Sequence, residues 1–453
     1  MKAVGIDIGT TNIGLVAVAL DTAQVVQRLS SPNRRIPSQD GFSYLQDPKT
    51  IAATAEELLS RLPMSASSIG VNGQVHGILY LDKRGKVLSP LYTWLDRRGT
   101  EQINGEVPRE RLLARCGRIL PNGYGLLTHY ANRIMDLVPD GAARITGICE
   151  YVTERILGGP LDKTDESCLA PFGGWDHLSG KHDPVLLAEI LPAGSPAFLA
   201  AAEPLSSAGR NSAGIPVAYP VGDTQASFFA LVIDPETTGL VSIGTSGQLT
   251  LFSRSSRRIP SMELRPYFGL GSLQVNATLC AGKAYEVLER FCQSILTRGD
   301  IKDADETFVY SLMEAAAREP GCGEALRVET SFNGNRADPS IRGSITGIGL
   351  DNLSLGSLVR GTIDGIVREL KDCRVDLGEE FRSISTLIAT GNTVRKNPLL
   401  VESLQRQFGL DTMAPDIDNA AAVGSALVGA VAAGTITLEE RVPLLKRLLW
   451  KSG

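Results

Sequence analysis

The sequence has few residues of the kinds that bind metals or cross-link a chain. Its seven cysteines are odd in number, widely spaced and without a CxxC pair, so we expect reduced thiols rather than a disulfide framework. Its four histidines form no HxxxH or HxxH pair, which gives a structural zinc site little support.

An excess of basic residues and long apolar runs are also missing. The net charge is −5, and a polyanionic partner normally requires a basic face, so nucleic acid is not an expected partner. Asp7 interrupts the only early apolar run, which argues against a signal peptide. The uncharged Ala/Gly/Val-rich stretch at residues 419–434 falls short of the ~20 residues that a membrane span needs. We therefore expect a cytoplasmic protein with no membrane partner.

The chain is long and rich in glycine. A length of 453 residues exceeds one ordinary core, and 47 glycines with 21% charged residues fit a globular chain with many turns. The default prediction is two large α/β domains. A proline- and glycine-rich segment between residues 192 and 216 marks the boundary, so the expected domains are residues 1–215 and 216–453.

The stretch from Val217 to Gln248 carries the strongest chemical signal. Asp223 lies between a short apolar run of strand type and the sequence TQASFFALVI, which has helical length and spacing. The following run, LVSIGTS, ends a second strand in small residues whose backbone amides can approach a phosphate. An acid and an anion-binding turn therefore lie close together in the sequence.

A similar turn opens the protein. The alternating run AVGIDI leads into GTTN at Gly9 to Asn12, and a second apolar run follows. Taken alone, this pattern fits an ordinary β-turn equally well. Two such turns, one in each half of the chain, together favour a phosphate-binding role.

Other polar side chains follow predicted strands. Gln74 and His76 come after the buried strand SIGV, and Asp96 and Arg97 follow another apolar run. Ligands bind at strand ends in α/β sheets, but a half-buried histidine and a surface ion pair are the alternatives. The loop around Trp175 either covers a substrate or packs as an ordinary loop, and the second interpretation is slightly favoured.

These patterns point to phosphoryl transfer. Paired domains with one turn motif each suit ATP held between them, and the reaction needs positioning, a cation and an acid that takes the acceptor's proton. Asp223 fits the general base, because an ionised carboxylate can orient and deprotonate an alcohol. Asp7, beside the first turn, suits Mg²⁺, together with Asp223. A strand, a turn at Gly391 and a helix suit the nucleoside.

The ordered motifs resemble those of the FGGY carbohydrate kinases. They are GIDIGTTN, VNGQVHG, TWLDRR, VGDTQAS, VSIGTSG, TLCAGKA, FNGNRADPSIRGSITGI, ATGNTVRKNP and NAAAVGSAL. The resemblance spans nearly the whole chain and implies two actin-like ATPase domains of ribonuclease-H-like α/β type, with ATP, Mg²⁺ and a sugar in the cleft between them. It implies Asp223 as general base; Thr10, Thr11 and Thr245 at the phosphates; Gly282, Gly391, Asn392 and Asn397 at the adenosine; and Gln74, His76, Asp96, Arg97 and Gln225 at the sugar.

Within that family the motifs favour a ketose. The Gln-Val-His sequence resembles the Gln-Met-His of xylulose and sedoheptulose kinases rather than the Arg-Glu of glycerol kinases, and we expect sedoheptulose ahead of D-xylulose. The expected partners are thus a ketose and ATP, with a homodimer left open. Family members commonly carry a lysine or arginine where this chain has Gly14. That difference motivates an alternative, a catalytically weak sugar- or nucleotide-binding regulator. NGQVHG and TWLDRR count against a third alternative, a chaperone-like or filament-forming ATPase.

Overall fold

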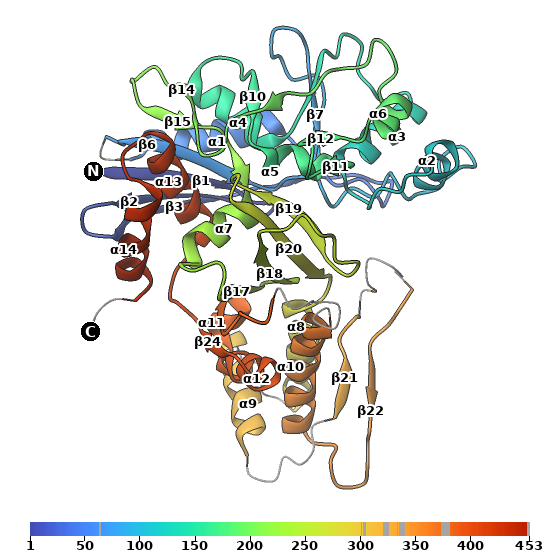
Figure 1. The fold of residues 1–453 in the computed structure, drawn as a ribbon. Coiled ribbons are helices and arrows are strands. Elements are labelled where there is room, and N and C mark those ends of the chain that lie inside the picture. The colour runs from blue at the N-terminus through green and yellow to red at the C-terminus, as the bar shows by residue number, and fades with distance from the viewer. Residues whose placement is uncertain are drawn as a thin grey trace. The chain divides into compact units, whose positions relative to one another are not determined.

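The computed structural model describes residues 1–62, 65–299, 301, 305–319, 326–332, 334, 340–372 and 381–450. The chain divides into two units, whose elements are labelled in Figure 1. Unit 1 comprises Met1–Ile233, Arg265–Gly271 and Ile417–Gly453, and unit 2 comprises Asp234–Leu264 and Ser272–Asp416. Unit 1 is therefore assembled from three separate parts of the chain.

The main sheet of unit 1 contains the first turn. Its order is β14 (Ser207–Arg210), β15 (Pro216–Ala218), β6 (Ser68–Gly73), β1 (Lys2–Ile8), β2 (Asn12–Ala19) and β3 (Gln24–Pro32), and β16 (Val221–Gly222) also pairs with β6. Strands β1, β2 and β3 are antiparallel, whereas β6 runs parallel to β1 and β15 runs parallel to β6. The carboxyl ends of β1, β6 and β16 consequently meet at one edge of the sheet.

Helices cover both faces of this sheet. Val4 and Ile6 of β1 share a hydrophobic cluster with α1 (Pro48–Ser60) and α4 (Ile148–Leu157). Gly5 lies between them and faces the other way, since successive residues of a strand alternate. There it meets α13 (Ala420–Ala432), which also contacts β6 and α7 (Asp223–Leu231). A helix near the C-terminal end of the sequence therefore covers one face of the sheet that contains the first strand.

Some of the remaining elements of unit 1 build a second hydrophobic cluster, which includes Tyr80, Leu112 and Trp175. The remaining helical elements of unit 1 are α2 (Pro108–Cys116), α3 (Gly125–Ile134), α5 (Glu166–Leu169), η1 (Ala170–Phe172), α6 (Pro184–Ile190) and α14 (Leu438–Leu449). Its short strands are β4 (Arg35–Ile36), β5 (Leu45–Gln46), β7 (Leu79–Leu81), β8 (Leu91–Tyr92), β9 (Arg144–Thr146), β10 (Lys163–Thr164), β11 (Trp175–Asp176), β12 (Lys181–His182) and β13 (Ala200–Ala201).

The sheet of unit 2 repeats the strand arrangement of unit 1. The whole six-stranded sheet has the order β19 (Glu263–Tyr267), β20 (Gly271–Thr278), β18 (Gly247–Ser253), β17 (Thr238–Ile243), β23 (Thr386–Thr390) and β24 (Asp411–Met413), and only residues 265–271 of it are counted with unit 1. Strands β20, β18 and β17 are antiparallel, and β23 and β24 continue in parallel. In unit 1, β3, β2, β1, β6 and β15 have the same sequence of directions.

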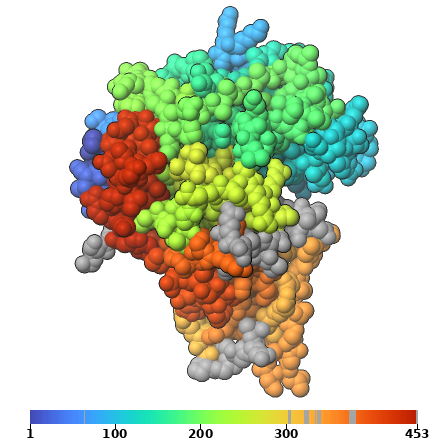
Figure 2. All heavy atoms as spheres, viewed as in Figure 1, coloured from blue at the N-terminus to red at the C-terminus, as the bar shows by residue number. Residues whose placement is uncertain are grey.

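Helices and one hairpin complete unit 2. They are α8 (Gly282–Arg298), α9 (Glu306–Arg318), α10 (Leu355–Lys371), α11 (Asn392–Lys396), α12 (Pro398–Phe408), β21 (Arg327–Glu329) and β22 (Ser344–Thr346). Helix α10 packs against α9 and α12. Figure 2 shows the atoms of α9, α10 and α12, coloured orange to red-orange, close together within unit 2.

Several expectations can be compared with these elements. The expected boundary after residue 215 lies inside unit 1, because β15 and β16 still pair with β6, and the chain passes to unit 2 at residue 234. The loop around Trp175 contains α5, η1, β11 and β12, and Trp175 itself is buried in the core. That geometry supports packing rather than a cover over a substrate. Among the described residues, no helix has the length and apolar character needed to cross a membrane.

Candidate functional site

Asp7 and Asp223 form the acidic centre of unit 1. Asp7 is near the carboxyl end of β1, and Asp223 is the first residue of α7, directly after β16. Burial, followed by the charge of Asp223, raises the pKa of Asp7 to about 7, and a hydrogen bond with Asn419 opposes this shift. Asp7 keeps part of its surface accessible, but protein atoms surround it closely enough for desolvation to dominate.

Neighbouring residues fix the carboxylate of Asp223. Its Oδ1 accepts a hydrogen bond from the Thr224 amide at 2.6 Å and from the Thr224 hydroxyl at 3.3 Å. The buried Arg265 donates in turn from Nη1 to the Thr224 hydroxyl at 2.6 Å. Asp223 also lies at the positive end of the α7 dipole, which favours a negative charge there.

Gly14 lies opposite Asp7, and the side chain of Asn419 occupies the space beside it. A Cβ at Gly14 would come within 2.1 Å of Asn419 Nδ2. Asn419 has a positive φ of 53° and caps α13 by accepting a hydrogen bond from the Ala422 amide. The cap is a local contact, whereas the contact with β2 joins residues about 400 positions apart. An amide therefore occupies the space beside Gly14, the position at which the family resemblance leads us to expect a cation.

The first turn is held from several sides. Asn33 donates from Nδ2 to the Gly9 carbonyl at 2.8 Å. Trp94 donates from Nε1 to the Thr10 hydroxyl at 3.0 Å. Thr11 is exposed beside it. The structure therefore leaves Thr11 accessible and brings Thr10 close to a tryptophan that sequence reasoning did not single out.

Gln74 and His76 follow β6, as predicted, and both are mostly buried. His76 Nδ1 lies 2.9 Å from the Pro171 carbonyl oxygen, and its ring contacts Tyr124 with centroids 4.6 Å apart. Because a carbonyl only accepts, Nδ1 carries the hydrogen and Nε2 is the acceptor in the neutral ring. The positive φ of 74° at His76 is uncommon for a residue with a side chain and holds the ring in this position.

Asp96 and Arg97 have different surroundings. Asp96 is completely buried and accepts two hydrogen bonds from the Arg98 guanidinium, at 2.7 and 3.0 Å. Arg97 is exposed and donates to the Gly41 carbonyl at 2.9 Å. The motif TWLDRR does not reveal which of its two arginines pairs with the acid. Residues 96 and 98 lie on the same side of the turn, and Arg98 also donates to Asn132 at 2.6 Å.

Gln225 is buried beneath the first turn of α7. Its Nε2 donates to the Pro266 carbonyl at 2.9 Å. The segment that carries Pro266 also supplies Arg265, and Phe228 of α7 contacts Tyr267 edge to face at 5.4 Å. Residues 265–267 therefore support the start of α7 and, through it, the position of Asp223.

Within unit 2, Thr245, Gly282 and Gly391 come together around the second turn. The Thr245 carbonyl accepts hydrogen bonds from the Ala281 and Lys283 amides, both at 3.1 Å. A Cβ at Gly282 would lie 2.2 Å from the Gly244 carbonyl oxygen, and one at Gly391 would lie 2.3 Å from the Ile243 carbonyl oxygen. Both glycines are therefore required for this close approach of backbones.

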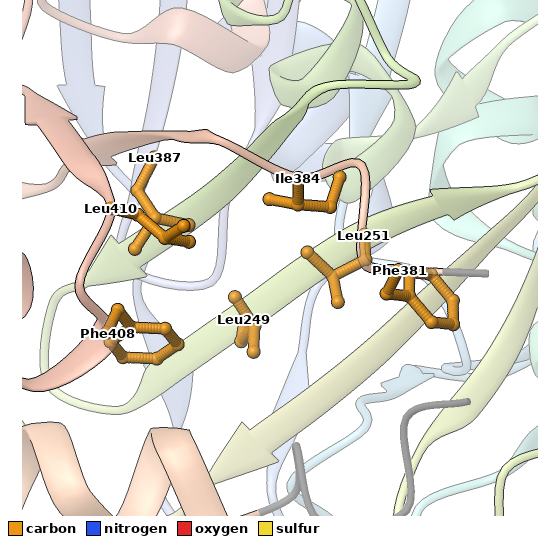
Figure 3. Close-up of a pocket in the computed structure, with 7 residues that line it drawn as sticks. All are labelled: Leu249, Leu251, Phe381, Ile384, Leu387, Phe408 and Leu410. Carbon is orange, nitrogen blue, oxygen red and sulfur yellow. The ribbon is translucent and has the colours of Figure 1, made fainter. Parts of the chain in front are cut away.

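Asn392 and Asn397 differ in exposure. Asn392 is exposed and accepts a hydrogen bond from Arg395, whereas Asn397 is buried and caps α12 by accepting from the Leu399 amide at 3.2 Å. Elsewhere in unit 2, a void of about 10 Å³ is lined by Leu249, Leu251, Phe381, Ile384, Leu387, Phe408 and Leu410 (Figure 3). Its lining is entirely apolar and offers nothing to orient a phosphate or a sugar.

The described residues contain no group of three or more His, Cys, Asp or Glu side chains that would hold a metal by themselves. Two carboxylates are nevertheless enough for Mg²⁺, which usually combines one or two of them with substrate phosphates and water. Burial is the larger cause of the raised pKa of Asp7, and the further increase caused by the charge of Asp223 reflects two acidic groups close together. This donor set fits Mg²⁺.

Comparison with known proteins finds a family that matches both halves of the chain. The models for the N-terminal and C-terminal domains of the FGGY family of carbohydrate kinases match residues 2–124 and 239–433. Human sedoheptulokinase is 26% identical over 475 residues, covering 94% of this chain and 96% of its own length. The xylulose kinase of Streptomyces coelicolor is 24% identical, covering 98% and 90%.

Solved structures share the fold. Gluconate kinase from Lactobacillus acidophilus superposes with a TM-score of 0.81 at 18% identity, covering 99% of this chain and 92% of its own. Xylulose kinase from Rhodospirillum rubrum gives a TM-score of 0.80 at 21% identity, covering 98% and 92%.

Proposed function

The chain belongs to the FGGY family of carbohydrate kinases, and from this premise we propose that it phosphorylates a ketose, with sedoheptulose as the favoured acceptor. Kinases of this family take the phosphoryl group from ATP. The observation that carries the proposal is Asp223, held by Thr224 at the start of α7 and next to Asp7. Human and mouse sedoheptulokinases, at 26% and 27% identity over 94% of the chain, support the choice of sugar. D-xylulose is the second candidate, because xylulose kinases also match.

In the proposed reaction, a ketose hydroxyl attacks the terminal phosphorus of ATP. A new O–P bond forms, the bond to the bridging oxygen of ADP breaks, and Asp223 takes the hydroxyl proton. Thr224 fixes the plane of the carboxylate by holding Oδ1. When bound by Asp7 and Asp223, Mg²⁺ supplies positive charge to the phosphates.

The remaining site residues have proposed roles in binding. Gln74 and His76 face the sugar, with Asp96, Arg97 and Gln225 supporting it, and the burial of Asp96 and Gln225 favours positioning over direct contact. Residues proposed to contact the nucleotide are Thr10, Thr11 and Thr245 at the phosphates and Gly282, Gly391, Asn392 and Asn397 at the adenosine.

A coupled ADP-release assay tests the proposal. The panel is sedoheptulose, D-xylulose, D-ribulose, L-ribulose, glycerol and no sugar, with wild type, Asp223→Asn and the exposed control Asp411→Asn. We expect sugar-dependent turnover that falls about 10²- to 10⁴-fold in Asp223→Asn, the range typical for loss of a general base, and stays unchanged in the control. Sugar binding without turnover in wild type would instead identify a regulator, and ATP hydrolysis independent of sugar would point to an ATPase.

A further inference from the structure

Gln46 lies between the first turn and the residues proposed to face the sugar. It ends β5, has no exposed surface, and pairs with Leu91 of β8. Its Nε2 donates to the Thr10 carbonyl at 2.8 Å, and its Oε1 accepts from Gln74 Nε2 at 2.7 Å. One buried amide therefore contacts both a turn residue and a residue of the proposed sugar site.

These contacts close into a ring. Thr10 donates from its hydroxyl to Gln74 Oε1 at 3.4 Å. The Thr10 carbonyl only accepts, so Gln46 must present its NH₂ group there and its oxygen to Gln74. Gln74 must then present its own NH₂ group to Gln46, which directs its oxygen to the Thr10 hydroxyl. The backbone of the turn thus determines the orientation of both amides.

The weakest link of the ring is at the Thr10 hydroxyl. Its hydrogen points to Gln74 across 3.4 Å, while its oxygen accepts from Trp94 at 3.0 Å. A hydroxyl has one hydrogen to donate. A phosphate oxygen that receives this hydrogen takes it away from Gln74 and leaves Gln74 Oε1 oriented to accept from a hydroxyl of the sugar.

We propose that Gln46 is a positioning residue that couples the phosphate turn to the sugar-side Gln74, so that nucleotide and sugar each favour binding of the other. This inference rests on the proposed function for the identity of the two ligands. The coupling is reciprocal, because it is a difference in binding free energy.

Two substitutions of Gln46 test the proposal. Gln46→Met removes both hydrogen bonds, and Gln46→Glu keeps the shape and the acceptor for Gln74 while losing the donor to Thr10. A buried polar group that loses its hydrogen-bond partner is strongly destabilised, so Gln74 should be held less well in its position. We therefore expect the KM for the ketose to rise about tenfold or more in both variants. In these variants the sugar affinity measured with Mg-ADP should become nearly equal to the affinity measured without it.

Gln274→Met is the matched control. Gln274 is also a buried glutamine that donates to a backbone carbonyl, that of Arg257 at 2.6 Å, but it lies in unit 2 outside the ring. The control should lower Tm without raising the KM for the ketose. If Gln46 has a purely structural role, Gln46→Glu should also lower Tm without raising the KM for the ketose, and that result would overturn the proposal.

A double-mutant cycle with Gln74→Met sharpens the test. If the two residues act through one ring, the fold-loss in sugar affinity of the double variant Gln46→Met/Gln74→Met should be much smaller than the product of the fold-losses of the two single variants. Fully multiplicative losses would contradict the coupling. If wild type phosphorylates no sugar in the panel, the proposed function fails separately. Calorimetry with Mg-ADP alone then tests whether the ring affects nucleotide binding. Weaker binding of Mg-ADP to Gln46→Glu than to wild type supports the proposal, and equal binding refutes it.

Discussion

Glu150 is a buried carboxyl group that the proposed reaction does not use. It lies in the first turn of α4, and burial raises its pKa to about 7, with hydrogen bonds to its own backbone amide and to Thr164 opposing the shift. The charges of Glu154 and Arg144 act on it in opposite directions. Because the native pKa exceeds that of an unfolded chain, the native state binds more protons between pH 4.5 and about 7.

Stability is therefore expected to fall as the pH rises through this window. Glu150→Gln removes the ionisation, so the free energy of unfolding of the variant, measured in urea at pH 5 and pH 8, should depend less on pH. Between pH 5 and pH 8, the change in the free energy of unfolding should differ between the two proteins by at most about 3 kcal/mol, at about 1.4 kcal/mol per pKa unit. Parallel pH profiles for the two proteins would show that Glu150 stays ionised in the folded state.

At the scale of elements, α13 approaches the sheet of unit 1 unusually closely. A Cβ at Gly70 would lie 1.8 Å from the Ser425 carbonyl oxygen, and one at Gly5 would lie 1.8 Å from that of Ala422. Asn72, completely buried in β6, donates to the Ala421 carbonyl at 2.9 Å and fixes the register of the contact. Backbone therefore packs directly on backbone.

Gly70→Ala should destabilise the protein by about 1–3 kcal/mol or more, because neither backbone can move aside easily. Gly159→Ala is the matched control, since a Cβ there meets nothing within 4 Å. The free energy of unfolding in urea measures both. Equal losses of unfolding free energy in the two variants would mean that α13 can move away from the sheet without destabilising the protein.

The long elements around both turns were predictable from sequence, but their supports were not. Alternation and glycine predict β1, the first turn and β2, and TIAATAEELLSRL predicts α1 because its apolar residues repeat with helical spacing. Two-residue strands such as β5 carry no periodic signal, so Gln46 could not be recognised from the sequence. Arg265 and Asn419 reach the site only through pairing of distant segments, which local spacing does not encode.

At the scale of the whole molecule, the same order of strand directions occurs in both units. The turn after β1 and the turn after β17 occupy equivalent positions in the two sheets. The sequence predicted this duplication from two Gly-Thr turns, and the repeated strand order confirms it as a property of the fold. We propose that each of the two turns binds phosphate.

Hydrogen exchange can test this use of both turns. Mg-ADP should slow amide exchange in residues 9–12 and in residues 244–247, since bound phosphate protects the amides that contact it. The turn at residues 83–85 is the internal control and should exchange at an unchanged rate. Protection confined to residues 244–247 would remove Thr10 and Thr11 from the phosphate contacts.

The return of α13 to the first sheet also affects how the protein is made. During synthesis β1 and β6 leave the ribosome early, but the helix that covers one face of them is encoded by residues 420–432. Until that helix emerges, the glycine-lined face of the first sheet lacks its cover and Asp7 lacks the amide of Asn419. The unit that is translated first is therefore the last to be completed, and a nascent chain that stops before residue 417 is expected to depend on chaperones.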